Sequence, residues 1–450
     1  MTTSNLKGRK ILFASIPADG HFNPLTGLAK HLQAVGCDVR WYTSARYETK
    51  LAKLHIPLYP FVKALDIPGD KIDEVFPERK EIKSTIKKLN FDLEHYFIKR
   101  GTEFYEDIKD INETFCFDLM IADCVFTGIP FVKELLHKPV IGVGVLPLTE
   151  TSKDLAPSGL GITPAKSAAG KLKQSLLRFA AKNILFRKPN QLFHTTLERY
   201  SIAHENIFLF DAMIKKSSML LQSGTPGFEY KRSDMSSNIK FIGSLLPHTT
   251  AASNTQWFDE RLNKYSHIVL VTQGTVEKDV NKIIIPTIEA FKNTETLVIA
   301  TTGGSQTAML KAKYPQQNVI VEDFIPFNDV MPYCDVYVTN GGYGGVMLGI
   351  ENKLPMVVAG VHEGKNEICA RVGYFKLGIN LKTETPNAQQ IYKAANEVMN
   401  NTIYKTNIEK LSDEFAEYDP NALCEKYVLE LLQHKNLTKS ISNKPAEKIY

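Results

Sequence analysis

The sequence predicts an α/β protein of two doubly wound domains, each a parallel β-sheet covered by helices on both faces. Three observations support this fold class. The chain has 450 residues, more than one hydrophobic core usually supports. In both halves, short apolar runs rich in β-branched residues alternate with helical patterns, which is the order that builds parallel sheets. Several of these runs end in glycine-containing turns that lead into a helix, as at ligand sites of open α/β sheets.

The elements of the first half are read from hydrophobic periodicity. Gly36 is expected to end the first long helix. Apolar runs predict strands at 10–16, 38–43, 119–122 and 140–145, and helices at 24–35 and 129–136. The long connections 66–80 and 149–171, rich in small and polar residues, are expected to be ligand-facing loops.

The second half repeats the pattern without an internal sequence repeat. Strands are expected at 239–242, 268–271, 296–300, 319–322, 336–339 and 356–359, with a helix at 283–291 and an amphipathic helix at 423–432. We expect a first domain at 1–236 and a second at 237–410. A helical segment at 411–434 could pack back on the first domain, and 435–450 is expected to be an unstructured polar tail.

Composition narrows the functional classes. The net charge of +5 is too mild to suggest a nucleic-acid-binding surface, and the six cysteines form no C-x-x-C pair. No apolar run reaches membrane-spanning length, and no signal-type core follows the N-terminus. We therefore expect a cytoplasmic protein with reduced cysteines and no membrane span, as a monomer or weak dimer.

The first strand is followed by Gly20 and His21, at the edge where open α/β sheets bind ligands. A histidine there can act as a general base, although a loop histidine without a role is the alternative. Asp123 follows the predicted strand 119–122, so it should emerge at the same edge and orient the imidazole; a helix N-cap is its alternative. Asp118 precedes that strand and should lie at the opposite edge.

A glycine-rich turn in the second half is the strongest candidate for an anion site. The predicted strand 336–339 is followed by Asn340, Gly341, Gly342, Tyr343, Gly344 and Gly345, and then by a helical pattern. Glycines allow close approach, and the free N–H groups of the first helical turn face an anion such as a diphosphate. A tight turn with no ligand is the alternative.

Two further segments of the second half could join that site. Gln273, Gly274 and Thr275 end a predicted strand and offer a hydroxyl and N–H groups to the same phosphates. Phe324, with Ile325, follows another strand, where the aromatic ring could stack on a base or be a core residue. The chain has no D-x-D or H-x-x-x-H motif, so we expect no metal site.

Together these motifs resemble the nucleotide-sugar-dependent glycosyltransferases of family 1, which have the GT-B fold of two Rossmann-like domains facing across a cleft. The resemblance covers nearly the whole chain, and G-H-F-N-P at 20–24, Asp123 and the block 324–370 carry it. It implies that His21 deprotonates an acceptor hydroxyl and Asp123 orients it. It also implies that Phe324 stacks on the base, that the Ile325 backbone bonds the base edge, and that Asn340 and the glycines hold the pyrophosphate opposite Thr275.

The chain departs from the family pattern at several donor positions. Asn340 stands where many members have histidine, and Gly344-Gly345 replaces an Asn-Ser pair. Leu348 aligns with the glutamate that usually binds the ribose. Within 362–367, Glu363 and Lys365 stand for the acidic-Gln pair that usually holds the sugar hydroxyls. The lysine would suit a different sugar or a phosphate contact.

The acceptor is expected to be a hydrophobic hydroxylated small molecule, such as a polyphenol, steroid, terpenoid or macrolide. The stretch 66–105 is rich in aromatic residues, and Phe22, Phe126 and Leu146 lie near predicted strand ends. The alternative is that most of these aromatic residues belong to the core.

The resemblance therefore implies an inverting, metal-independent transfer from a UDP-sugar, with UDP-glucose favoured and a dTDP-deoxysugar possible, and no separate cofactor. Three other classes stay open. A sugar-nucleotide epimerase of GT-B fold would release nucleotide without an acceptor. A non-catalytic nucleotide-sugar-binding protein would bind the donor without turnover. An NAD-dependent enzyme is disfavoured because the glycine turn lacks G-x-G-x-x-G.

Overall fold

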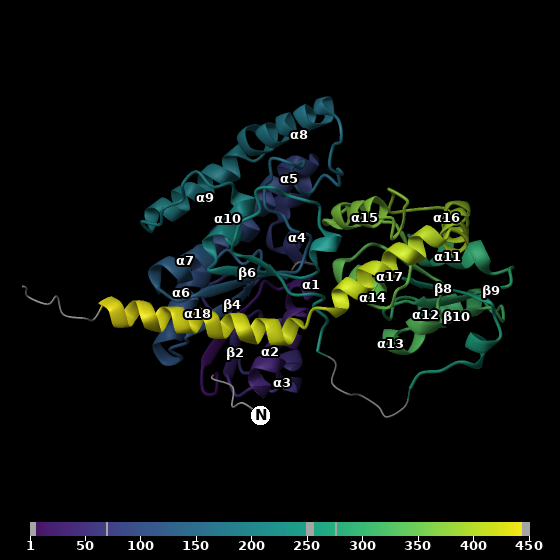
Figure 1. Cartoon of the computed structure of the whole chain (residues 1–450), viewed down its shortest axis with the longest axis horizontal. Coiled ribbons are helices and arrows are strands. Elements are labelled where there is room, and N and C mark those ends of the chain that lie inside the picture. The colour runs from purple at the N-terminus through teal and green to yellow at the C-terminus, as the bar shows by residue number, and fades with distance from the viewer. Residues whose placement is uncertain (1–5, 69–70, 249–255, 275–276, 443–450) are drawn as a thin grey trace, which may run out of the picture.

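Two parallel β-sheets, each flanked by helices, form the two halves of the protein (Figure 1). The computed structural model describes residues 6–68, 71–248, 256–274 and 277–442, with the backbone alone described from 434 onward. Both sheets are built from short runs of buried aliphatic residues, which explains why hydrophobic periodicity located most of them.

The first sheet has seven strands in the order β3-β2-β1-β4-β5-β6-β7, with neighbours running parallel. The strands are β1 Lys10–Ala14, β2 Asp38–Thr43, β3 Leu58–Pro60, β4 Leu119–Asp123, β5 Val140–Gly144, β6 Met219–Gln222 and β7 Ile239–Phe241. The helices are α1 Asp19–Phe22, α2 Leu25–Ala34, α3 Glu48–Lys53, α4 Ile72–Val75, α5 Thr85–Asp92, α6 Lys99–Thr114, α7 Ile129–Leu135, α8 Ala168–Ala180, α9 Arg187–Arg199 and α10 Leu209–Lys216.

Alternate residues of the central strands enter the cores on opposite faces of this sheet. Leu12 and Met120 belong to the core that includes side chains of α6, whereas Phe13 and Ile121 belong to the core beside α2. The two cores hold the carboxyl ends of β1 and β4 side by side, which fixes the position of the groups that follow them.

The second sheet has six parallel strands in the order β10-β9-β8-β11-β12-β13. Its strands are β8 His267–Thr272, β9 Thr296–Thr301, β10 Val319–Glu322, β11 Val336–Thr339, β12 Met356–Val358 and β13 Gly378–Asn380. The helices are α11 Ile284–Phe291, α12 Thr307–Lys313, α13 Phe327–Val330, α14 Tyr343–Glu351, α15 Lys365–Tyr374, α16 Ala388–Asn400, α17 Thr402–Ala416 and α18 Pro420–Ser442. Together the two sheets confirm the predicted α/β class.

Strand β7 corrects the expected domain boundary. It pairs with β6 in the first sheet, so the first domain extends beyond residue 236 and includes a strand that we had assigned to the second half. The sequence pattern also missed β3, β6 and β13. Two of these have three residues and the third has four. The two shortest include Pro60 or Gly378, residue types that favour turns over strands.

The C-terminal helices divide between the two domains. Leu411 and Phe415 of α17 pack in the second domain's core, whereas Cys424 and Val428 of α18 pack in the first domain's core beside α2. Helix α18 thus lies along the first domain, as the sequence suggested (Figure 1). It continues to Ser442, so residues 435–442 are helical where an unstructured tail was expected.

Candidate functional site

His21 and Asp123 meet at the carboxyl edge of the first sheet. His21 lies on the single-turn helix α1, which follows β1, and Asp123 is the last residue of the neighbouring strand β4. The Nδ1 atom of His21 is 3.2 Å from Oδ1 of Asp123. The structure therefore brings together the two residues that the sequence proposed as base and partner.

Asp123 is held rigidly in this position. Its side chain is fully buried, Oδ2 accepts the N–H of Ile16 at 2.9 Å, and Oδ1 accepts the N–H of Val125 at 2.9 Å. Because a carboxylate only accepts hydrogen bonds, Nδ1 of His21 is the donor of the pair. The lone pair of a neutral imidazole then lies on Nε2, the arrangement that a general base requires.

Asp118 lies at the other end of the same strand. It accepts the N–H of Lys10 at 2.9 Å, at the start of β1. This confirms that Asp118 is at the opposite edge, where it is paired with Arg9 at 3.8 Å.

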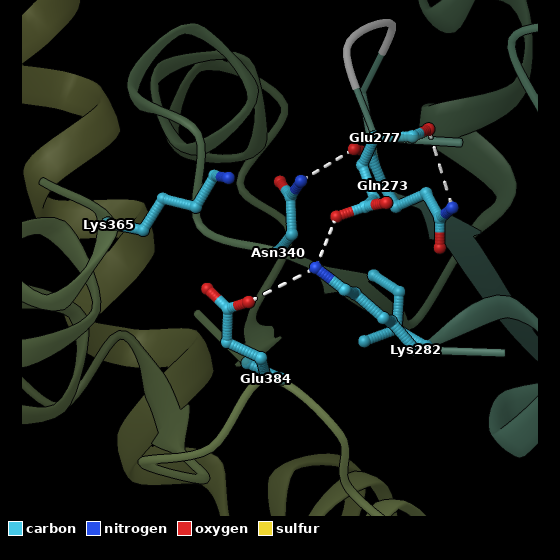
Figure 2. A pocket seen from close by; sticks show the side chains of 8 residues that line it. Gln273, Glu277, Lys282, Asn340, Lys365 and Glu384 are labelled. Atoms are coloured by element: carbon cyan, nitrogen blue, oxygen red, sulfur yellow. Dashed lines mark hydrogen bonds and ion pairs between the residues drawn. The ribbon is translucent and has the colours of Figure 1, made fainter. Parts of the chain in front are cut away.

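A small pocket lies at the corresponding edge of the second sheet (Figure 2). Its empty space, including the part open to solvent, is about 230 Å³, and its lining includes three predicted donor residues, Gln273, Asn340 and Lys365. Asn340 follows β11, and its Nδ2 donates to the backbone carbonyl of Gln273, which follows β8, at 2.5 Å. Gln273 is buried, and its Oε1 has no hydrogen-bond partner among the described residues. A ligand donor such as a sugar hydroxyl would satisfy that atom.

An ion-paired cluster that the sequence analysis missed forms another wall of the pocket. Lys282 contacts Glu277 at 2.5 Å and Glu384 at 3.2 Å (Figure 2). The hydrogen bond to Glu277 raises the pKa of Lys282. Burial opposes ionisation of Glu384, but the N–H groups of His362 and Val361, together with Lys282, outweigh it and lower the pKa of that carboxyl. Glu384 is 102 residues from Lys282, so no spacing pattern could have joined it to the other two.

The glycine turn leads into α14 as predicted. Gly342 is the N-cap residue, and no side chain caps this helix end. The N–H groups of the first turn are consequently available to an anion. Gly344 is exposed with open space where a side chain would be, whereas a Cβ at Gly341 would lie 2.3 Å from the Cys369 sulfur at a φ of +76°. Gly341 thus shapes the turn, and Gly344 leaves room above it.

Glu363 and Lys365 follow β12, the strand next to β11; Glu363 precedes α15 and Lys365 is its first residue. The Lys365 ammonium is 2.6 Å from Glu363 Oε2. The lysine side chain is 18% exposed and lines the pocket, whereas that of Glu363 is 68% exposed and does not. Figure 2 shows the Lys365 side chain extending toward Asn340. Lys365 is therefore the better placed of the two to meet a ligand.

Tyr343 differs from its predicted role. Its side chain is buried, and its hydroxyl donates to the backbone carbonyl of Ser223 in the first domain at 2.7 Å. The ring therefore contributes to the contact between the domains, and only the backbone of Tyr343 remains at the helix N-terminus.

Two of the three predicted acceptor contacts are core residues. Phe22 is fully buried and stacks on Tyr47 at 4.0 Å, and Phe126 is fully buried and stacks on Phe104 at 4.6 Å. Because neither ring has exposed surface, neither can contact a bound acceptor, and these two predicted acceptor contacts are wrong. The sequence placed both rings near strand ends but could not tell which way they point. Leu146 is partly buried, and its role stays a prediction.

A second hollow lies next to Asp123, with which it is connected through Ile16. Its empty space, including the part open to solvent, is about 200 Å³. It lies at the end of β1 and is lined by Ile16, Pro17, Phe61, Leu65, Ile67, Tyr96, Arg100 and Phe104. The N–H of Ile16 bonds Asp123, so this apolar hollow adjoins the candidate base. Most of its lining residues fall within the aromatic-rich stretch 66–105 or just before it.

The remaining predicted donor residues lie at the expected edges, and their contacts stay predictions. Phe324 follows the edge strand β10 and is 68% exposed, whereas Ile325 is buried. Gly274 has a φ of +76° directly after Gln273, and Thr275 lies outside the described residues. Gly20 is exposed on α1 in the first domain.

A second glycine turn escaped the sequence analysis. The segment 302–305 follows β9, between β8 and β10, and the N–H of Gly303 donates to the Asp323 carbonyl at 2.9 Å. Its Thr-Gly-Gly-Ser sequence has the same strand-then-glycine pattern as 339–342 and could have been found by it.

Two kinds of feature are absent from the described residues. They contain no cluster of three or more His, Cys, Asp or Glu side chains arranged to hold a metal ion. No helix within the described ranges combines the length and apolar character needed to span a bilayer.

Comparison with known proteins identifies the family. A family model described as UDP-glucoronosyl and UDP-glucosyl transferase matches residues 107–419. The chain is similar to 4'-demethylrebeccamycin synthase of Lentzea aerocolonigenes, with 30% identity over 92% of this chain and 97% of that protein. It is also similar to UDP-glucosyltransferase 1 of Beauveria bassiana, with 27% identity over 95% of each chain. The crystal structure of the calicheamicin glycosyltransferase CalG4 superposes with a TM-score of 0.73 over 95% of this chain and 98% of that chain, at 16% identity, in agreement with the expected GT-B fold. The protein therefore belongs to the UDP-glucoronosyl and UDP-glucosyl transferase family of glycosyltransferases, family 1.

Proposed function

We propose that this glycosyltransferase moves a sugar from a UDP-sugar, with UDP-glucose favoured, to a hydroxyl of a hydrophobic small molecule. The single observation that carries the proposal is the His21–Asp123 pair at the carboxyl edge of the first sheet. A buried carboxylate that fixes an imidazole by Nδ1 leaves Nε2 to take a hydroxyl proton. General-base help of this kind contributes about 10²–10⁴-fold to the rate.

The donor is assigned to the second domain. The uncapped start of α14 and the open space at Gly344 suit a diphosphate, and Lys365 supplies a positive charge beside them. The unpartnered Oε1 of Gln273 suits a sugar hydroxyl. UDP is favoured over dTDP because the family description and the fungal relative both name UDP-sugars.

The acceptor is assigned to the hollow beside Asp123. Its lining is mainly apolar and aromatic, which favours a greasy molecule such as a polyphenol, steroid, terpenoid or macrolide. Arg100 adds one polar contact. It is 8% exposed and paired with Glu103 at 2.8 Å, and its Nε has no hydrogen-bond partner among the described residues. That N–H suits an oxygen on the acceptor, a carbonyl or phenolic group.

The mechanism that follows is a single inverting displacement without metal. His21 removes the proton as the acceptor oxygen attacks the anomeric carbon, and the nucleoside diphosphate leaves from the opposite face. Backbone N–H groups and Lys365 stabilise the leaving diphosphate, and the two domains hold the reacting groups in line.

The test is a transfer assay in EDTA with UDP-glucose and a panel of polyphenols, steroids, terpenoids and macrolides. We expect a glycoside detectable by mass spectrometry, with anomeric configuration opposite to that of the donor by NMR. A thermal-shift panel run beside it should show stabilisation by UDP of about 2.7 kcal/mol at a hundred times its dissociation constant.

Other outcomes would each contradict the proposal. A strict requirement for Mg²⁺ would exclude the metal-free diphosphate site. Release of nucleotide or an altered sugar without acceptor would favour an epimerase. Donor binding without turnover on any acceptor would favour a non-catalytic binding protein. Stabilisation by dTDP alone would show that the donor is a dTDP-sugar and not a UDP-sugar.

A further inference from the structure

Helix α8 of the first domain is amphipathic, but with its apolar side facing outward. Leu172, Leu176 and Phe179 recur at helical spacing and are 61–63% exposed. The side that faces the protein carries Gln174, which is buried and donates to the carbonyl of Thr163 at 2.9 Å. A surface helix normally buries its apolar stripe and exposes its polar side. In α8 this order is reversed, and the apolar stripe stays exposed in the part of the chain that the structure describes.

The stripe continues past the end of α8. A π-helical turn, Ala181–Leu185, follows directly, and within it Ile184 is 66% exposed. The carbonyl of Leu185 accepts a hydrogen bond from the Asn90 side chain at 2.8 Å, which fastens the turn to α5. Figure 1 shows α8 at the outer rim of the first domain, beyond α5. The apolar side chains therefore face outward from a segment that is hydrogen-bonded to α5.

The charge around the stripe is strongly positive. Residues 155–197 include seven Lys and Arg and no Asp or Glu. The whole chain has a net charge of +5, so the rest of it has a net charge of −2. Lys171 and Lys173 flank Leu172 on opposite sides of the helix, since successive residues are rotated by about 100°. An apolar stripe bordered by lysines on both sides is the pattern of a helix that lies in the plane of an anionic membrane surface.

A second copy of the chain is a poor occupant of this surface. A two-fold dimer places the same patch of each subunit against the other. Lysines would then face lysines, and residues 155–197 contain no acidic side chain to pair with them. An anionic lipid surface satisfies both features together, because acyl chains receive the leucine and phenylalanine side chains while headgroups neutralise the lysines.

We propose that α8 and the π-helical turn after it dock this protein on anionic lipid bilayers. The side chains that enter the interface are Leu172, Leu176, Phe179 and Ile184, and the flanking lysines contact the headgroups. The proposal does not depend on the assignments of donor, acceptor or base. It does explain how an enzyme without a membrane-spanning helix among its described residues would reach lipid-dissolved molecules.

The experiment is co-sedimentation of the full chain with vesicles made of equal parts phosphatidylcholine and phosphatidylglycerol, beside vesicles of phosphatidylcholine alone. We expect binding to the anionic vesicles only, weakened by salt because the lysine contribution is screened. An apolar variant replaces three exposed side chains of the stripe: Leu172→Gln, Leu176→Gln and Phe179→Gln. A charge variant reverses the two flanking lysines, which are exposed: Lys171→Glu and Lys173→Glu.

Each variant should lower vesicle partitioning about tenfold or more. Unchanged thermal unfolding will show that the fold is intact, because the replaced apolar side chains are exposed. Control variants change the same number of exposed groups in the second domain and should bind like the parent chain. The apolar control is Met309→Gln, Tyr392→Gln and Ile403→Gln, and the charge control is Lys393→Glu and Lys410→Glu.

Three results would overturn the proposal. One is absence of sedimentation with anionic vesicles at low salt. Another is vesicle binding that the stripe variants leave unchanged. The third is a dimer, seen by size exclusion without lipid, that the apolar variant converts to monomer, which would make the stripe an interface between copies.

Discussion

The two sheets place pairs of side chains at equivalent positions, but with different chemistry. In the order β3-β2-β1-β4 and in the order β10-β9-β8-β11, the central strands β1 and β4 correspond to β8 and β11. After the first pair of strands, His21 meets Asp123. After the second, Asn340 meets the backbone of Gln273. One edge carries a titratable pair suited to moving a proton, and the other a neutral pair suited to holding a ligand.

This difference indicates how the same sheet topology can serve two different roles in one protein. A base needs a partner whose position does not change, and two backbone N–H groups fix Asp123. A diphosphate cradle needs free N–H groups and space, and α14 begins without a side-chain cap beside the open Gly344. Because the two roles lie in separate domains, substitutions in one should leave the other intact.

The largest effect is expected from His21→Ala. Loss of the base should lower kcat by about 10²–10⁴-fold while the KM for the donor changes little. Initial rates at varied donor concentration measure both. His31→Ala is the matched control, since His31 also contacts a carboxylate, Glu425, at 2.9 Å, but lies on α2; a comparable loss of rate in that control would remove the special role of His21.

Asp123→Asn should have the next largest effect. The amide weakens a charge-assisted hydrogen bond of about 1.5–3 kcal/mol, which corresponds to a kcat about 10- to 100-fold lower. It also offers one acceptor oxygen where two backbone N–H groups need one each, so urea unfolding should show a loss of about 1–3 kcal/mol. Asp118→Asn makes the same change at the opposite edge and should leave kcat unaltered. Equal kcat values for the two variants would speak against the pair.

Lys365→Met should act on the donor side alone. Removing the cation beside the α14 turn should raise the donor KM about tenfold or more, the value of one charged hydrogen bond, with a smaller change in kcat. Lys353→Met, which removes an exposed lysine paired with Asp413, is the control. An unchanged donor KM in Lys365→Met would place the diphosphate elsewhere.

The smallest expected effect is that of Phe324→Ala. Stacking of a base on an aromatic ring contributes about 1–3 kcal/mol, so UDP should bind about tenfold more weakly by calorimetry. Stability should not fall, because this ring is 68% exposed. Phe258→Ala changes another exposed phenylalanine of the same domain and should not affect UDP. If the two variants bind UDP alike, Phe324 does not stack on the base.

The sequence predicted the parts of the fold and the site that depend on local pattern. Buried strands of four or more aliphatic residues and the turns after them were found, because strand ends and glycines mark the carboxyl edge directly. The pairing of His21 with Asp123 followed from one topological rule, that parallel strands present their ends together. The same rule placed Asp118 at the far edge, where it lies.

What the sequence could not predict depends on side-chain direction and long-range contact. Phe22 and Phe126 follow strand ends, yet both rings turn into the core. Tyr343 stands within the glycine turn, yet its hydroxyl reaches Ser223 in the other domain. Lys282 and Glu384 are 102 residues apart and meet only through the fold. Burial and tertiary contact determine these positions, and neither has a local signature.

The central claim is that the base lies in the first domain and the donor site in the second. It is tested most directly by calorimetric titration of UDP, in EDTA, into the parent chain, His21→Ala and Gly344→Leu. The account predicts equal affinity for the first two proteins. It predicts binding at least about tenfold weaker for Gly344→Leu, whose side chain would occupy the open space above the turn at a helix N-terminus suited to phosphate. Loss of UDP affinity in His21→Ala, or full affinity in a folded Gly344→Leu, would contradict it.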